Sequence, residues 1–533
     1  MTASQAEQLG QAIRDVRPRQ IGVLPLVYPI LSALQVRELT NELVPSQADI
    51  DLGRIVELLT INRLLAPQPL YRVQDWLAKT VLPEMMDIAP AQVYDNRLGR
   101  ALDRLHPHLG ELWARVVSQA IEVYDLDLNV LHWDITSIYF EGAYTDSELA
   151  AYGYSRDHRP DTKQVNLEVD VTHDGYVPIL YHLLPGATAD ITRPLPHLRA
   201  LLRLFARPEL ADRHLRPILV SDCKMITPEA VWASHQHDLF YLGPLPPGKA
   251  TEAVLRSVSA SELAAHPLTY RPKRVKANDP RFVPYQGVWR SFTFEHEGEQ
   301  TVDRALVIWS AGKQRLDEQK RKTHLKRLLN RLADIEKKLN TRRYKKQTYV
   351  EERLVTAQKG NPAKDLVKVD LSGEDGALQL TFRIDRERLA EAQTLDGRYA
   401  LATNAAHLTA DEALTLFKGQ DGAEKRFQSA KGPLLIRPLF VRSDQRIEGL
   451  VFVTLLALLT RAILERACRQ QGRPLTAERL FRGFANLQAV DLTWADGSLQ
   501  RQASEMTAFQ REILETLGWP AADAYARLAR PKG

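Results

Sequence analysis

Two aspartates lie in apolar parts of the sequence, where an isolated charge is unfavourable. Asp134 interrupts the stretch "VLHWDITSIYFEG" (130–142), and Asp222 ends the apolar run of "RPILVSDCKM" (216–225). A buried carboxylate is normally paired, hydrogen-bonded or bound to a metal ion, because burial otherwise disfavours its charged form. Metal binding is therefore one role for these acids. For Asp134 the alternative is capping of a following turn together with Thr136 and Ser137.

Strands are the elements expected to carry the acids. Val130, His132 and Asp134 alternate with apolar neighbours, which is the period of a β-strand. The stretch "QVNLEVDVTHDGYVPILYHLLPG" (164–186) predicts two further strands joined by a turn at Asp174-Gly175. Three consecutive strands of this kind form an antiparallel meander.

The order of the elements predicts the fold class. A helix is expected over 192–206, and a buried strand then ends at Asp222 before another helix begins at Thr227-Pro228. The order along the chain is therefore strand, strand, strand, helix, strand, with an acid on the first and fourth strands. This order matches the ribonuclease H-like α/β fold. In that fold the first and fourth strands lie adjacent and parallel, so we expect Asp134 and Asp222 to come together on a mixed sheet flanked by helices.

Other polar residues of these strands are expected to have structural roles. Asp170 and Asp174 are explained by the hairpin. His132 and His182 are interpreted as packed or hydrogen-bonded strand residues, and neither is assigned a catalytic role.

The composition is that of a globular protein with several domains. Lys and Arg total 71 against 66 Asp and Glu, but residues 313–346 alone hold fourteen Lys or Arg and four acids, so a net charge of +10 is concentrated there. Cys223 and Cys468 lack the spacing of a disulfide framework or zinc site, which fits a reducing interior. The N-terminus does not resemble a signal peptide, and the apolar run 450–459 is too short to span a membrane, so no membrane association is expected.

Periodicity and composition divide the chain into five parts. For the N-terminal part, residues 1–125, two roles remain open: binding of DNA ends, or packing alone. The parts are a helical N-terminal domain (1–125), the first part of the ribonuclease H-like core (126–243), an inserted β-rich domain with a long basic helix (244–395), the second part of the core (396–470) and a helical C-terminal tail (471–533).

The long helix of the inserted domain concentrates the positive charge. Its leucines form one stripe, while Lys326, Arg327 and Arg331 lie off that stripe. These cations belong either to a solvated face of a packed helix or to a surface that contacts DNA phosphates, where basic residues gain by releasing counterions.

The arrangement resembles a DDE-type insertion-sequence transposase, and the likeness covers most of the chain. "GYSRDHRPDTKQVNLEVDV" (153–171) and "LLPGATADITRP" (183–194) look like the stretch that such transposases carry after their first catalytic aspartate. "DGRYALATN" (396–404) looks like the strand before their last catalytic helix.

The YREK signature of that group can be placed on the sequence. Its spacing is intact at Phe417, Gln420, Glu424 and Lys431, but Phe replaces Tyr and Gln replaces Arg. In the family the Tyr and Arg help to hold DNA phosphates. The resemblance implies that Gln420 and Lys431 contact DNA, and we expect Lys418 or Lys425 to supply the charge that Gln420 lacks.

The resemblance also implies a chemistry. Phosphodiester hydrolysis and transfer of the freed 3′-hydroxyl use two divalent ions about 3.5 to 4 Å apart. Asp134 would bridge two Mg²⁺ ions, which Mn²⁺ can replace, while Asp222 would bind one ion and Glu424 the other. The expected partners are double-stranded DNA, as element ends and target, and a second copy of the chain in a homodimer. A nucleoid-associated location in the cytoplasm of a prokaryote is expected.

Two alternatives remain. A DNA-binding protein derived from a transposase would keep the fold without catalysis, and the altered signature at Phe417 and Gln420 favours it. A ribonuclease H-like nuclease would cleave without strand transfer, but the large insertion and the helical ends favour a transposase.

Overall fold

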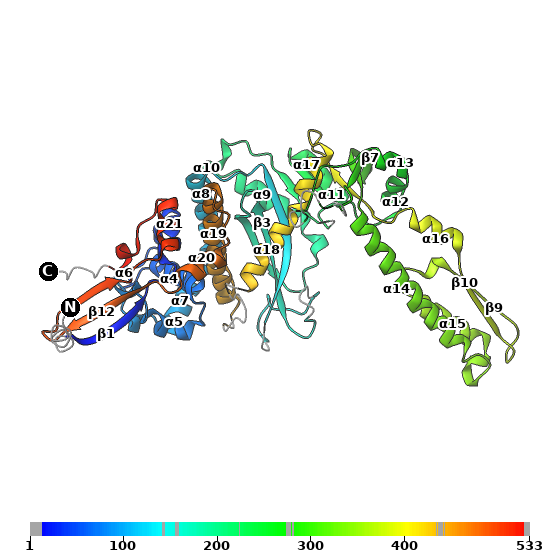
Figure 1. Cartoon of the computed structure of the whole chain (residues 1–533). Helices are drawn as coiled ribbons and strands as arrows, with labels where there is room; N and C mark the ends of the chain where they lie inside the picture. The colour runs from blue at the N-terminus through cyan, green and yellow to red at the C-terminus, as the bar shows by residue number, and fades with distance from the viewer. Residues whose placement is uncertain are drawn as a thin grey trace. The chain divides into compact units, whose positions relative to one another are not determined.

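A computed structural model describes residues 13–140, 144–154, 159–222, 224–272, 275, 279, 282–432, 434, 441 and 443–526. The chain divides into two compact units, which are described separately. The first comprises Met1–Asp222, His237–Leu239 and Lys418–Gly533, and the second comprises Cys223–Gln236 and Phe240–Phe417. Figure 1 shows the elements of both units, coloured from blue at the N-terminus to red at the C-terminus.

A mixed sheet forms the centre of the first unit, with strands in the order β4-β3-β2-β5. Strand β2 pairs antiparallel with β3, β3 pairs antiparallel with β4, and β2 pairs parallel with β5. These directions are those of a ribonuclease H-like core, so the expected α/β fold class is confirmed. The bounds are β2 (Val130–Tyr139), β3 (Gln164–Thr172), β4 (Pro178–Pro185) and β5 (Ile218–Val220).

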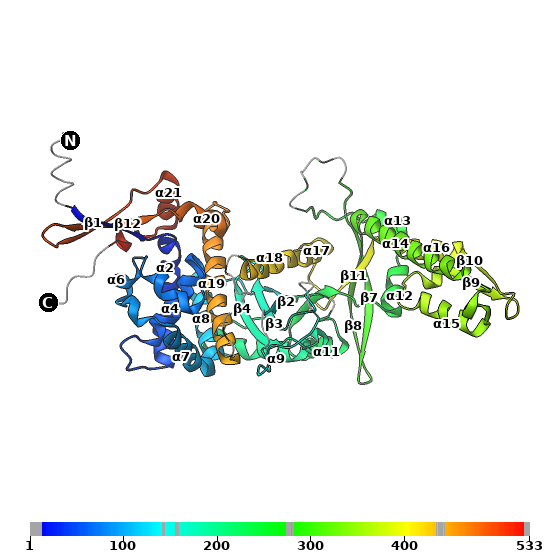
Figure 2. The same cartoon turned by 90° about the horizontal axis from the view of Figure 1, so that it is seen from below.

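Helices cover both faces of this sheet. Asp134 lies opposite Val169 in the β2–β3 register, whereas Glu168 lies opposite Ile135, so the two acids point to opposite faces. Helix α18 (Gln420–Lys431) packs on the face of Asp134 and α9 (Pro194–Phe205) on the face of Glu168. Figure 2 shows these two helices on opposite sides of β2 and β3.

One long apolar helix, α19 (Asp444–Gln470), occupies the middle of the helical part of the first unit. Its length and composition would allow it to cross a membrane, but 94% of its most apolar window is buried in the protein. The surrounding elements explain the burial. They include β4, α2 (Leu24–Ala33), α4 (Leu52–Leu65), α7 (Asp95–Leu105), α8 (Leu109–Tyr124) and α20 (Ala477–Phe484).

Strands from both ends of the sequence form a second sheet in the first unit. Strand β1 (Ile13–Gln20) pairs antiparallel with β12 (Gln488–Trp494), which pairs with β13 (Leu499–Ala503). The regions 1–125 and 471–533 were expected to be helical, and these strands correct that expectation. Strand β1 is an edge strand, so it tolerates Pro18, and its partner lies far away in the sequence. The turn between β12 and β13 contains Gly497 with φ of 82°, which follows Asp496 as in a hairpin.

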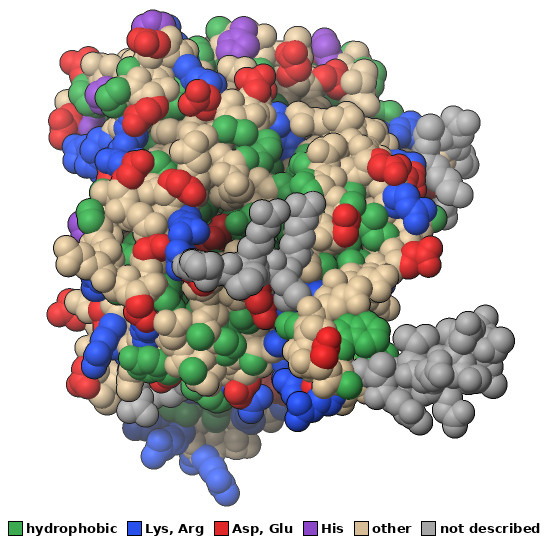
Figure 3. Space-filling model, turned by 90° about the vertical axis from the view of Figure 1, so that its left-hand side faces the viewer, with side chains coloured by type: hydrophobic (Ala, Val, Ile, Leu, Met, Phe, Trp, Pro, Cys, Tyr) green, Lys and Arg blue, Asp and Glu red, His purple; other side chains and the backbone are tan. Residues whose placement is uncertain are grey.

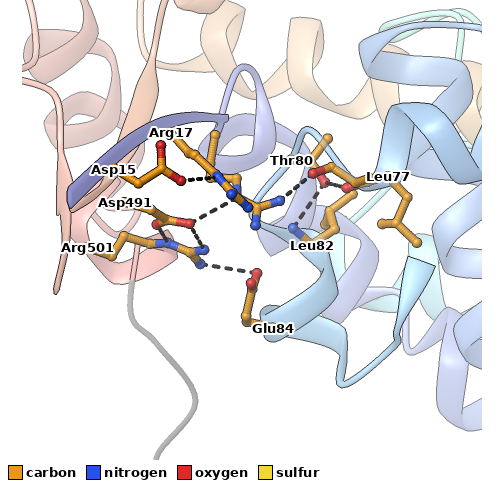
Figure 4. A network of polar contacts seen from close by, with 10 residues as sticks. Asp15, Arg17, Leu77, Thr80, Leu82, Glu84, Asp491 and Arg501 are labelled. Atoms are coloured by element: carbon orange, nitrogen blue, oxygen red, sulfur yellow. Dashed lines mark hydrogen bonds and ion pairs between the residues drawn. The ribbon is translucent and has the colours of Figure 1, made fainter. Parts of the chain in front are cut away.

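A polar network fixes this terminal sheet to a helix of the first unit (Figure 4). Asp491 on β12 accepts hydrogen bonds from Arg19 on β1 (3.0 Å) and from Arg501 on β13 (2.5 and 2.9 Å). Arg501 also donates to Glu84 of α6 (Leu82–Met86) at 3.2 Å. Asp491 is 3% exposed, so losing either arginine would leave a buried charge poorly compensated.

The second unit contains four strands in the order β6-β11-β8-β7 and a separate hairpin of β9 and β10. Strands β7, β8, β9 and β10 and the long helix α14 lie in the part that was expected to combine β-structure with a basic helix, whereas four further helices between residues 244 and 395 were not expected. The strands are β6 (Phe240–Pro244), β7 (Gln286–His296), β8 (Glu299–Trp309), β9 (Val367–Ser372), β10 (Gln379–Ile384) and β11 (Arg398–Thr403). The helices are α11 (Pro228–Gln236), α12 (Lys249–Arg256), α13 (Ala260–Ala264), α14 (Ala311–Glu336), α15 (Gln347–Gln358), α16 (Arg386–Gln393) and α17 (Ala410–Lys418).

Helix α14 ends at Glu336, before the last basic residues of the predicted helix, which lie in a 3-10 turn (Arg342–Lys345). Its buried leucine stripe packs in one cluster with residues of α15, β9 and β10. Lys326, Arg327 and Arg331 are exposed, as the stripe predicts.

On the surface at the left of Figure 1, the described residues show no such concentration of one charge. Figure 3 shows acidic and basic side chains interspersed on that side of the molecule.

Candidate active site

Asp134 lies in β2, and Asp222 follows the end of β5, the strand that pairs parallel with β2. The β2–β5 pairing matches Leu131 with Leu219 and His132 with Val220. Each aspartate lies two residues further along its chain than this last pair, Asp134 inside β2 and Asp222 just beyond the end of β5. The predicted parallel pairing of the first and fourth strands is therefore confirmed, and the joint action of the two acids stays a prediction.

Asp134 lies inside β2 and not at its end. Its Oδ1 atom accepts a hydrogen bond from the Ile135 backbone N–H at 2.8 Å, and its side chain is half-buried. Thr136 and Ser137 continue the strand and pair with β3. The interpretation of Asp134 as a turn cap is therefore wrong, because no turn follows it.

Glu424 lies on α18, which is held against β2 by Gln420. The Gln420 side chain donates from Nε2 to the Trp133 carbonyl at 2.8 Å, and its Oε1 lies 3.0 Å from His132 Nδ1. Glu424 is one helical turn after Gln420 and is exposed. The third predicted acid therefore projects from a helix that is anchored beside Asp134.

Two further contacts fix the position of α18. At Gly422 an added Cβ atom would lie 1.9 Å from the Tyr176 ring, so only glycine allows this approach. Arg426 is 6% exposed and donates to the carbonyls of Gly175 (2.6 Å) and Tyr176 (3.1 Å). It also pairs with Glu465 of α19 at 2.6 Å. The β3–β4 hairpin and α19 together determine where Glu424 lies.

The β3–β4 turn is anchored to α19 as well. Gly175 has φ of 94°, as the predicted Asp-Gly turn requires. Arg466 pairs with Asp174 at 2.6 Å and donates to the backbone carbonyls of Tyr124 and Asp125. The hairpin explanation of Asp174 is confirmed.

His132 lies between the anchored helix and a second histidine. Its Nε2 atom is 2.9 Å from His173 Nδ1, and the residue is fully buried. Burial lowers the pKa of His132 to about 4, although the hydrogen bond that its Nδ1 donates to Gln420 Oε1 opposes this shift. His132 is therefore neutral near pH 7 and acts as a hydrogen-bonded strand residue, as predicted.

The expected DNA-binding residues are divided between the two units. In the first unit, Lys425 is exposed, while Lys418 and Lys431 are half-buried and burial lowers the pKa of Lys418. In the second unit, Arg331 of α14 donates to the Ala357 carbonyl at 3.3 Å. Their contacts with DNA stay predictions.

The altered signature residues have roles within the protein. The Phe417 ring lies 6.4 Å from the Tyr399 ring in the second unit. Both the Oε1 and the Nε2 atoms of Gln420 are hydrogen-bonded within the first unit. The sequence did not indicate this role, because His132 is 288 residues away from Gln420. A glycine inside a predicted helix, here Gly422, is the sequence feature that indicates a close approach of α18 to a neighbouring element, in this case to Tyr176.

Known proteins give limited guidance. Residues 16–117 match the model of a domain of unknown function, DUF4277. No curated protein matches the chain.

Several solved structures of transposases are similar to the chain. The structure entitled "Cryo-EM structure of piggyBac transposase synaptic complex with hairpin DNA (SNHP)" has 8% identity and a TM-score of 0.38, over 88% of this chain and 82% of that one. "Crystal structure of a pre-cleavage Mos1 transpososome" has 18% identity and a TM-score of 0.16, over 38% of this chain and 62% of that one. "Crystal structure of the Mos1 mariner paired end complex with Mn" has 15% identity and a TM-score of 0.16, over 42% and 76%. Likenesses this weak do not determine the chemistry of this chain.

Proposed function

We propose that this protein is a metal-dependent DDE-type transposase that cuts DNA at the ends of its element and joins them to a target. The observation that carries the proposal is the parallel pairing of β2, which contains Asp134, with β5, which ends two residues before Asp222. Glu424, on a helix anchored to β2 beside Asp134, supplies the third acid.

The residues fit divalent ions that prefer oxygen ligands. Asp134 and Asp222 are half-buried and Glu424 is exposed, so each carboxylate is accessible to a hydrated ion. Mg²⁺ keeps several waters and binds through few carboxylates, and Mn²⁺ accepts similar ligands. When bound, two such ions stabilise the attacking and leaving oxygens of an in-line phosphoryl displacement.

The remaining residues of the site would position the acids and the DNA. Gln420, Gly422 and Arg426 hold α18 in place, so they orient Glu424. Lys425 is exposed one residue after Glu424 and would contact a phosphate near the reacting bond. The exposed cations of α14 would bind the phosphate backbone away from it. Because two element ends must be held together, we propose that the active form is a homodimer.

A DNA-binding derivative without catalysis is the second candidate. It is favoured by Gln420, whose amide is engaged inside the protein, and by Phe417, which lacks the family's hydroxyl. The three acids favour an enzyme, because carboxylates near phosphates weaken binding unless cations lie between them.

The experiment is cleavage and joining of a labelled duplex that carries the sequences flanking the gene for this chain. The wild type is compared with Glu424→Gln, in Mg²⁺ and in Mn²⁺, with Asp421→Asn as the matched control. Asp421 is an exposed acid in the first turn of the same helix. We expect Glu424→Gln to abolish nicking and joining while DNA binding survives, and Asp421→Asn to retain both. Specific binding without cleavage by the wild type in either metal would support the DNA-binding derivative instead.

A further inference from the structure

A second cluster of potential metal ligands lies on the other face of the sheet in the first unit. It consists of Glu168 on β3, His182 on β4 and His197 on α9, whose ligand atoms all lie within 4.8 Å of one another. Glu168 and His197 are fully buried, while the His182 side chain is 31% exposed. No sequence motif connects these three residues, because three separate elements contribute one residue each.

The distances in the cluster suit ligands of one ion better than hydrogen bonds. Glu168 Oε2 lies 3.1 Å from His182 Nδ1 and 3.7 Å from His197 Nδ1. The second distance is too long for a hydrogen bond. Several buried polar atoms here have no hydrogen-bond partner of good geometry: His182 Nδ1, both ring nitrogens of His197 and the carboxylate oxygens of Asp170. A tetrahedral zinc ion with bonds of about 2.0 to 2.1 Å separates its ligand atoms by about 3.3 Å, between these two distances.

A second carboxylate is placed as in known histidine–metal sites. Asp170 Oδ2 lies 3.1 Å from His197 Nε2, the ring nitrogen that faces away from Glu168. Ligating histidines usually donate their other ring N–H to a carboxylate, which fixes the tautomer and the ring orientation. Asp170 is completely buried in the middle of β3, so the hairpin explanation given for it above is wrong.

The negative charges of the buried acids in the cluster are only partly balanced by a neighbouring arginine. Glu168 and Asp170 are two buried acids, and Arg193 supplies one permanent positive charge by donating to Glu168 Oε2 at 2.8 Å. Trp133 Nε1 donates to the other oxygen of Glu168 at 3.2 Å. The remaining negative charge would be balanced by a metal ion, by a protonated histidine or by a proton on Asp170 itself.

We propose that Glu168, His182 and His197 bind a zinc ion, with Asp170 as the carboxylate that orients His197. Three protein ligands leave a fourth position for water. A cavity of about 570 Å³ reaches His182 and gives the ion an entry path at the edge strand β4, between α8 and α9. The site lies on the opposite face of the sheet from Asp134, so it is separate from the proposed catalytic ions and does not depend on the proposed function.

The test is zinc binding by the full chain after chelator treatment, in excess Mg²⁺ to occupy oxygen-only sites. Zinc is counted per chain by mass spectrometry, and thermal unfolding is followed with and without zinc. Cobalt(II) replaces zinc in a parallel absorption measurement, which reports nitrogen ligands. His182→Ala is the variant, because this side chain is partly exposed and its loss should not prevent folding. His106→Ala is the matched control, since His106 lines the same cavity outside the cluster.

We expect one zinc ion per wild-type chain at micromolar zinc, a higher Tm with zinc, and at least about a hundredfold weaker binding in His182→Ala. His106→Ala should bind zinc like the wild type. The proposal is overturned if the wild type binds no zinc at micromolar concentration, or if His182→Ala binds it as tightly as the wild type. In that case a proton on His197 balances the charge. Although burial lowers the pKa of His197, Asp170 and Glu168 raise it to about 9.

Discussion

The two faces of the sheet in the first unit carry acids in opposite situations. Asp134, on the face covered by α18, is half-buried, and so is Asp222, two residues after the end of β5. Glu168 and Asp170, on the face covered by α9, are completely buried among Arg193, His182 and His197. Acids near the end of a parallel strand pair stay accessible to hydrated ions. Acids in the middle of a covered strand need cations or partners built into the fold.

The largest effect should come from removing an accessible acid. We expect Asp134→Asn and Asp222→Asn each to reduce metal-dependent cleavage to background, a loss of more than about 100-fold, since even indirect metal contacts matter by 10- to 100-fold. Stability should change little, because each side chain is half-buried. Cleavage assays and urea unfolding measure the two effects, and a large loss of stability would show that these acids are structural.

Removing a buried acid should have the opposite result. We expect Asp170→Asn to lower the free energy of unfolding by about 3 to 5 kcal/mol, because His197 loses a buried partner. Asp174→Asn is the control, since Asp174 pairs with Arg466 at a more exposed turn. Urea unfolding midpoints decide the matter, and equal effects of the two substitutions would contradict the contrast between the faces.

The pH dependence of stability tests the comparison at a third buried acid, Glu57. Burial raises the pKa of Glu57 on α4 to about 7, although Arg37 opposes this, whereas the histidines and Arg193 outweigh burial and hold the pKa of Glu168 low. Folded Glu57 therefore keeps its proton where the unfolded chain has lost it. Stability should fall by up to about 3 kcal/mol as pH rises from 4.5 through 7.

Glu57→Gln should remove this part of the pH dependence, so the variant is more stable than the wild type above pH 7 and similar to it near pH 4.5. Unfolding midpoints across this range provide the measurement. Parallel curves for the two proteins would show that Glu57 ionises normally.

The smallest effect concerns the anchor of α18. We expect Gln420→Ala to slow cleavage about tenfold, because Glu424 loses the contacts that fix its helix to β2. DNA affinity should remain unchanged if Gln420 acts only inside the protein. Weaker binding with an unchanged cleavage rate for bound DNA would instead support the family role of this position as a phosphate contact.

Local patterns were enough to predict the face of Asp134. The alternation around Asp134 predicted β2, Asp174-Gly175 predicted the hairpin, and the order of elements predicted that β2 and β5 are parallel neighbours. These features depend on short stretches of sequence, so the prediction needed no knowledge of distant contacts.

The opposite face could not be predicted in the same way. In β3 the alternating Val165, Leu167 and Val169 suggest that the other side faces solvent, yet all nine residues of the strand are buried. The cover comes from α9, and sequence period alone does not show which polar face a helix will bury. The pairing of β1 with β12 was missed for a similar reason, since each strand is unremarkable until its distant partner is known.

The pairing of the two terminal strands has a consequence for how the protein is made. Arg19 and Asp491 are 472 residues apart, and at about 5 to 20 residues per second a ribosome needs roughly 20 to 90 s to deliver the second after the first. During this interval β1 has no partner strand, while the second unit is completely synthesised. An interrupted translation product would keep Asp134 and Asp222 but lack the sheet that closes the first unit. We therefore expect such fragments to be unstable, so that DNA cutting would be restricted to chains translated beyond β13.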